Sequence, residues 1–210
     1  MKKLYVYCIP LFVVLFLAGC DERRLAENIS RQKDDAEPFV VWDLAQNFCP
    51  PPIILQYDPL TKTGANWQEV KDPPWYANTP PVMIGRAAAY LREGLQKMTG
   101  KEFPVISTND LKNGIILTLR KNAPEDIRND LEIKTALASD PSDQYAANEA
   151  FFIRSEKNRI ILVANTVSGL LNAVVELLES VEYEVLGMGP NWIYVPDYRQ
   201  KRLVFSIKRR

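Results

Sequence analysis

Apolar residues recur every three or four positions in two segments of the chain, which is the spacing of an amphipathic helix. The two stripes consist of Ala87, Leu91, Leu95 and Met98, and of Leu170, Leu171, Val174, Leu177 and Leu178. Gly100 stands where the first helix would stop, and Thr166 or Ser168 can cap the second. The pattern predicts helices over about residues 83–99 and 167–180.

Short β-branched and aromatic runs predict the strands. Residues 115–119 and 203–207 are apolar runs, and 53–57 is the strongest strand signal in an otherwise irregular segment. Residues 151–154 and 159–163 flank a short polar turn, which predicts an antiparallel hairpin. The order strand, helix, strand, hairpin, helix, strand predicts an α+β fold, with a mixed, mainly antiparallel sheet and two amphipathic helices packed on one of its faces.

Prolines and charges divide the rest of the chain. Residues 38–81 hold nine of the fifteen prolines together with Trp42, Trp67 and Trp75, so helix is excluded over most of this segment. We expect it to form an irregular layer on a core. Residues 21–37 are polar and densely charged, which suits a solvated tether. Residues 82–210 form the predicted α+β domain.

The first twenty residues have the composition of an export signal. Lys2 and Lys3 precede an apolar run over residues 4–19, which is shorter than a membrane-spanning helix and is interrupted by Pro10. The ending Leu-Ala-Gly before Cys20 resembles a bacterial lipobox. That resemblance implies a signal peptide over residues 1–19, a tether over 20–37 that begins with a lipid-modified Cys20, and a protein anchored by its lipid to a membrane of the bacterial cell envelope.

Composition excludes several classes of chemistry. The chain has no histidine, which removes serine–histidine and cysteine–histidine nucleophiles and histidine metal sites. The 26 basic and 26 acidic residues balance, so nucleic acid is not an expected partner. With Cys8 in the signal peptide and Cys20 acylated, Cys49 has no disulfide partner, and we expect it to be a small buried hydrophobe. No cofactor or metal is expected.

The region from about residue 82 to 198 resembles the small domain that precedes the catalytic barrel in bacterial β-hexosaminidases and α-glucuronidases. The order and spacing of the motifs carry the resemblance more than any one of them. They are Ala87–Leu91, Met98–Gly100, Phe103–Val105, Phe151–Ile153, Ile160–Ala164, Gly169–Val174, Glu176–Glu179, Gly187–Pro190, Trp192 and Val195–Pro196. Relatives usually carry an arginine followed by an aromatic residue where this sequence has Glu184-Val185-Leu186.

In those enzymes the catalytic carboxylates lie on a barrel of about 250 residues that follows this domain. Twelve residues remain after residue 198, so the resemblance implies a non-catalytic accessory domain, either a truncated gene product or one half of a split enzyme whose barrel is separately encoded. Such a domain would expose an apolar patch where it docks. The acidic pairs Glu176/Glu179, Asp126/Asp130 and Asp140/Asp143 fit exposed helix ends and turns better than a small hydrolase site.

A stand-alone carbohydrate-binding lipoprotein is the alternative, because exposed aromatic rings stack on sugar rings. Its candidate contact residues are Trp67, Trp75 and Tyr76. Trp192 lies within an apolar segment, and core or interdomain packing is expected for it.

Overall fold

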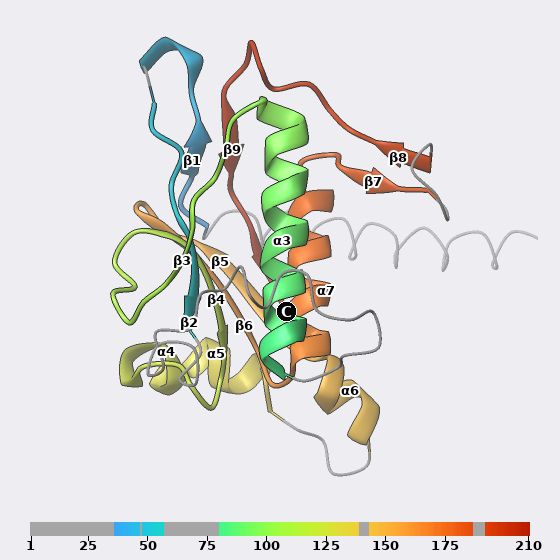
Figure 1. Cartoon of the computed structure of the whole chain (residues 1–210). Helices are drawn as coiled ribbons and strands as arrows, with labels where there is room; N and C mark the ends of the chain where they lie inside the picture. Colours follow the sequence, from blue (N-terminus) through green and yellow to red (C-terminus); the bar gives the residue numbers. More distant parts are fainter. Residues whose placement is uncertain (1–35, 47, 57–79, 139–142, 187–191) are drawn as a thin grey trace, which may run out of the picture. The chain divides into compact units, whose positions relative to one another are not determined.

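A six-stranded mixed sheet organises the part of the chain that the computed structural model describes, which is residues 36–46, 48–56, 80–138, 143–186 and 192–210. These residues all belong to one compact unit, Ala36–Arg210. Across the sheet the strands are β10 (Lys208–Arg209), β5 (Phe151–Ser155), β6 (Arg159–Ala164), β4 (Gly114–Leu119), β2 (Ile53–Gln56) and β3 (Val105–Ser107), as Figure 1 shows.

Parallel pairs occupy one half of this sheet and antiparallel pairs the other. Strands β3, β2, β4 and β6 are parallel neighbours, whereas β5 pairs antiparallel with both β6 and β10. Two further antiparallel ribbons bring the antiparallel pairs to four of the seven between described strands. The predicted α+β fold with a mixed sheet is confirmed, and the runs expected at 53–57, 115–119, 151–154 and 159–163 form its centre.

The two long helices pack on the same face of the sheet, as predicted. Helix α3 (Pro80–Thr99) and helix α7 (Val167–Glu179) lie side by side in Figure 1. Their stripes share one core with alternate residues of the strands, including Ile53, Leu55 and Ile115. Helix α3 begins three residues before the predicted start, because prolines are tolerated in a first helical turn.

Short helices cover the opposite face of the sheet, and the sequence pattern did not predict them. Helices α4 (Glu125–Asn129) and α5 (Leu131–Ala136) place Ile127 and Ile133 against Ile54, Ile116 and Ile161. Helix α6 (Gln144–Glu149) follows. The sequence of residues 121–150 shows only a mostly polar composition. Each of these helices is shorter than two turns, which is too short to show a helical period.

Helix ends follow the local chemistry of the sequence. The hydroxyl of Thr166 accepts a hydrogen bond from the N–H of Gly169 at the start of α7. Gly100, with φ of 70°, ends α3, and its N–H donates to the carbonyl of Gln96 at 2.8 Å. The carboxylates of Asp130 and Asp143 cap α5 and α6. Capping is therefore the structural role of Asp130 and Asp143, two of the acidic residues that were candidates for a small hydrolase site.

The last strand differs from the prediction. Instead of one strand over 203–207, β9 (Leu203–Phe205) pairs antiparallel with β1 (Phe39–Trp42), and after a bend β10 joins the central sheet. Strand β1 and the short 3₁₀ helix η1 (Leu44–Gln46) were not predicted. The proline-rich segment therefore contributes β1 and the central strand β2 to the same unit as residues 82–210.

No helix among the described residues is long and apolar enough to cross a membrane. The predicted signal peptide, Cys20 and the tether up to residue 35 lie outside the described residues.

Candidate functional site

A two-stranded ribbon after α7 carries half of the large exposed apolar side chains of the described residues. Its strands are β7 (Glu184–Val185) and β8 (Ile193–Tyr194). Glu184 pairs with Tyr194 and Val185 with Ile193. The N–H of Leu186 donates to the carbonyl of Trp192 at 2.7 Å, which continues the pairing by one step. In Figure 1 the ribbon extends to one side of the layer formed by α3 and α7.

The two faces of the ribbon have different environments. Residues opposite each other in an antiparallel pair project to the same side, so Leu186, Trp192, Tyr194 and Glu184 share one face. Leu186 is 64% exposed, Trp192 58% and Tyr194 52%, and we call this side the open face. On the other side, Ile193 packs against the main core. Val185, opposite Ile193, is 47% exposed, so the ribbon is held to the domain through Ile193 and presents an apolar open face to solvent.

Buried aromatic residues fasten the base of the ribbon. The ring of Tyr183, which is buried, meets the ring of Tyr90 on α3 edge to face, with centroids 6.5 Å apart. Beyond β8, Tyr198 packs against the core and its N–H donates to the carbonyl of Met98 at 2.9 Å. Burial raises the pKa of all three tyrosine hydroxyls, so each is a neutral phenol at physiological pH.

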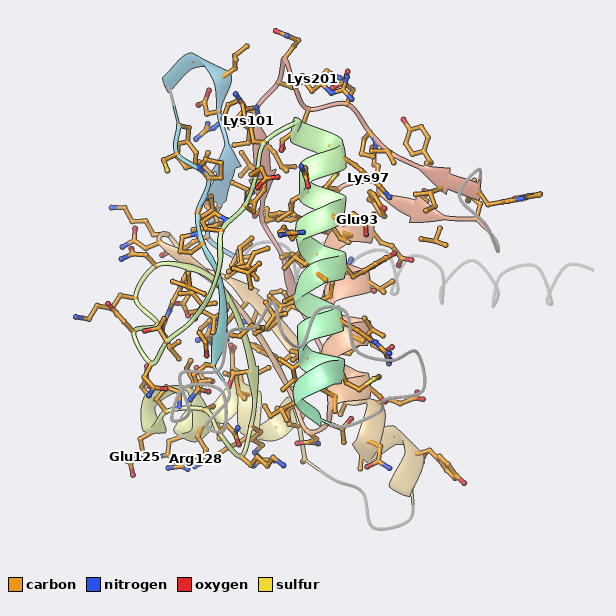
Figure 2. All side chains as sticks on the ribbon, in the orientation of Figure 1. Glu93, Lys97, Lys101, Glu125, Arg128 and Lys201 are labelled. Atoms are coloured by element: carbon orange, nitrogen blue, oxygen red, sulfur yellow. The ribbon has the colours of Figure 1, made fainter. Side chains whose placement is uncertain are left out.

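An ion pair on α3 lies beside this base. The ammonium of Lys97 is 3.3 Å from the carboxylate of Glu93, and both side chains are labelled in Figure 2. The charge of Glu93 adds to the raised pKa of Tyr183 after the larger effect of burial. Charged groups therefore surround the base of the ribbon, whereas the sequence from Val185 to Pro196 contains no charged residue at all.

The carboxylates that the fold brings together are engaged by cations. The guanidinium of Arg154 lies 2.9 Å from Asp130, 3.2 Å from Glu132 and 2.9 Å from Glu156. Lys208 contacts Glu132 at 2.7 Å. Partial burial would raise the pKa of Asp130, but the hydrogen bond from Arg154 and those from backbone N–H groups lower it below its usual value.

The same network also shifts the pKa values of Glu132 and Arg154. The hydrogen bond from Lys208 is the main cause of the lowered pKa of Glu132, and partial burial opposes it. Desolvation alone would lower the pKa of Arg154, but its hydrogen bonds with Asp130 and Glu156 raise it. The carboxyl groups of Asp130 and Glu132 are stabilised as anions, which suits an ion-pair network that joins α5 to the sheet and does not suit a general acid at neutral pH.

Two other acidic candidates have structural explanations. Glu176 lies 3.2 Å from the guanidinium of Arg209, and Asp126 is in the first turn of α4, where a negative charge is favourable. Asp140 lies outside the described residues. Within the described ranges, no group of three or more acidic or cysteine side chains is arranged to hold a metal ion.

A shallow polar hollow of about 550 Å³ lies where the β5–β6 turn meets the loop before β4. It is lined by Glu37, Lys112, Asn113, Glu156, Lys157, Asn158 and Arg159. The carboxylate of Glu37 accepts a hydrogen bond from the N–H of Lys157 at 2.8 Å, and Glu156 is paired with Arg159. The lining holds no aromatic ring, so it offers no surface on which a sugar ring would stack.

The structure corrects two expectations about single residues. Trp192 was expected in a core or an interdomain contact, and the core assignment is wrong because more than half of the side chain is exposed. Cys49 was expected to be buried, and it is exposed. Trp42, in contrast, is buried beneath the ammonium of Lys101, 5.0 Å from the ring centroid, and offers no platform. Trp67, Trp75 and Tyr76 lie outside the described residues.

Sequence reasoning considered Trp192 but did not identify the ribbon. The available signal was the absence of charge from Val185 to Pro196, combined with the alternation of Trp192, Ile193 and Tyr194 after a Gly-Pro-Asn sequence. That composition is equally typical of a core hairpin, which is why the exposure could not be inferred. Comparison with protein-family models and with curated proteins finds no match to this sequence.

Proposed function

We propose that this protein is a non-catalytic accessory domain of a glycan-processing system, carried by a lipid-anchored protein of the bacterial cell envelope. The observation that supports it is the agreement between the motif order of the family it resembles and the elements of the structure. The helix ends at Gly100, the hairpin spans β5 and β6, and the capped second helix follows at once.

The local chemistry of the acidic residues is consistent with a role without catalysis. Asp130, Glu132 and Glu156 share Arg154, Asp143 caps a helix, and Glu176 pairs with Arg209.

The proposal is tested with the purified chain and a barrel-type glycosidase encoded beside its gene. Alone, the chain should not hydrolyse chromogenic hexosaminides or glucuronides, and it should form a stable complex with that glycosidase in size-exclusion chromatography. Hydrolysis that is lost on substitution of an acidic residue would contradict the proposal, as would a genomic neighbourhood whose glycosidases do not bind.

A stand-alone carbohydrate-binding lipoprotein is the second candidate, and the exposed indole of Trp192 favours it. Saturable binding of a soluble glycan, weakened by alanine at Trp67, Trp75 or Tyr76, would support this candidate over the first. Lipid attachment is common to both, and labelling of growing cells with an alkyne fatty acid checks it: we expect label on the wild-type chain and none on Cys20→Ser.

A further inference from the structure

We propose that the open face of the β7–β8 ribbon inserts into the surface of the lipid bilayer to which the protein is anchored. This inference rests on the membrane anchoring in the proposed function, and it adds a second point of membrane contact within the folded domain. Two observations favour the bilayer as the partner of the open face: the chemistry of the ribbon and the length of chain that joins the domain to Cys20.

The polarity of the open face changes along the ribbon in the order that a membrane surface requires. Leu186 and Trp192 form the outermost described pair, and Tyr194 and Glu184 lie two positions closer to the domain. Tryptophan and tyrosine favour the boundary between headgroups and acyl chains, with aliphatic groups deeper and charged groups outside. Insertion with this pair foremost would place Leu186 and Trp192 among acyl chains while Glu184 stays in water.

The ribbon can enter a bilayer without any rearrangement of the fold. Its inner face is already held by Ile193, and its base by Tyr183 and Tyr198. Interfacial segments bury their apolar face by about 5–10 Å, which is comparable to the few residues of this ribbon. The ion pair of Glu93 and Lys97, labelled in Figure 2, belongs to α3, and Glu184 is the one charged residue of strands β7 and β8.

The anchor keeps the bilayer within reach. Fifteen residues lie between Cys20 and Ala36, so the tether spans at most about 55 Å when fully extended. A lipid-anchored domain on such a tether meets the membrane continually. A second apolar contact, within the folded domain, would orient the domain at the bilayer and add to the hold of the lipid anchor.

Other occupants fit the open face less well. A stable protein interface takes about 800 Å² from each partner and some 20–30 residues, far more than this short ribbon offers by itself. A sugar site needs several polar groups that converge on the ligand, and the described open face offers only the Glu184 carboxylate, the Trp192 indole N–H and the Tyr194 hydroxyl, spread along two strands. A bilayer surface requires neither.

Fluorescence quenching by lipids tests the proposal. The chain from residue 20 carries Cys20→Ser, Cys49→Ser and Leu186→Cys, with an environment-sensitive dye on the new cysteine. An N-terminal hexahistidine tag holds it on vesicles of phosphatidylethanolamine, phosphatidylglycerol and a nickel-chelating lipid, so the experiment does not depend on natural acylation. The control carries the dye at Leu131→Cys, an exposed position on α5.

We expect lipids with nitroxide on the acyl chain to quench the dye at position 186 at least about twofold more than the dye at 131. Adding Trp192→Glu should remove the difference, with an unchanged circular dichroism spectrum showing that the chain is folded. Equal quenching at both positions would overturn the proposal, and so would a dye response to soluble glycan without a response to vesicles. Failure of fatty-acid labelling at Cys20, in contrast, would count against natural anchoring alone.

Discussion

The backbone at Gly114 has a conformation and a close neighbour that disfavour any side chain. Its φ is 113°, a conformation that side chains rarely allow, and a Cβ atom there would lie 2.5 Å from the carbonyl oxygen of Pro52. We expect Gly114→Ala to lower the free energy of unfolding by roughly 2–4 kcal/mol in urea titrations. Gly94→Ala is the matched control, because its nearest neighbours are the flexible ends of Leu178 and alanine favours a helix. A similar loss in both variants would contradict this explanation.

Two tryptophans give a second contrast between single residues. Trp42 is 4% exposed within the core, whereas Trp192 lies on the open face of the ribbon. We expect Trp42→Ala to lower the free energy of unfolding by about 3–5 kcal/mol and Trp192→Ala to change it by less than about 0.5 kcal/mol. Chemical denaturation of the two variants in parallel checks this. A large loss for Trp192→Ala would mean that the ribbon is part of the core.

At the scale of elements, the network around Arg154 joins α5, β5 and β10. Its side chain is mostly buried, so Arg154→Met removes three carboxylate contacts at a partly desolvated site. We expect a loss of about 1–2 kcal/mol at neutral pH, between the values typical of exposed and buried pairs. Lys97→Met breaks an exposed pair within α3 and should change stability by a few tenths of a kcal/mol.

The pH dependence of this difference has a definite sign. The pKa values of Asp130 and Glu132 are lower in the folded chain than in the unfolded one, so their contribution to stability is complete above the unfolded pKa values. It is lost as pH falls through the folded values. The gap between wild type and Arg154→Met should therefore narrow below about pH 4 in denaturation curves. A gap that is constant from pH 7 to pH 3 would assign the loss to packing instead.

The sequence pattern predicted the long helices and strands better than the short ones. Helix α3 and helix α7 show their period over several turns, and the strands β4, β5 and β6 are long enough to show a β-branched run. Helices α4 and α5 each place one isoleucine on the core, which defines no period. The parallel pairing of β2 with β4 depends on contacts between distant segments, and no local pattern encodes it.

The ribbon shows the same limit for a candidate site. An uncharged run with tryptophan and tyrosine is the composition of a core strand, of a binding surface and of a membrane contact alike. What separates them is how much apolar area the rest of the chain supplies as cover. The rest of the domain covers the side chain of Ile193 but leaves that of Trp192 exposed.

At the scale of the whole molecule, strand β9 joins the last part of the chain to the first. Phe205 pairs with Phe39, and both are buried in the main core. We expect Phe205→Ala to lower the global free energy of unfolding by about 3–5 kcal/mol, with β1 and β9 losing hydrogen-exchange protection together. Loss of protection in β9 alone, with β1 unaffected, would show that the pair is not a cooperative part of the unit.

The beginning and the end of the compact unit meet at one corner. The hydroxyl of Ser206 donates to the carbonyl of Ala36 at 3.2 Å, the N–H of Glu37 donates to the carbonyl of Ser155 at 3.2 Å, and β10 pairs with the same strand β5. A domain whose two ends leave from one place can be spliced into a surface loop of a host protein without stretching either chain. Gene fusions can therefore carry this domain as an internal insertion as readily as at a terminus.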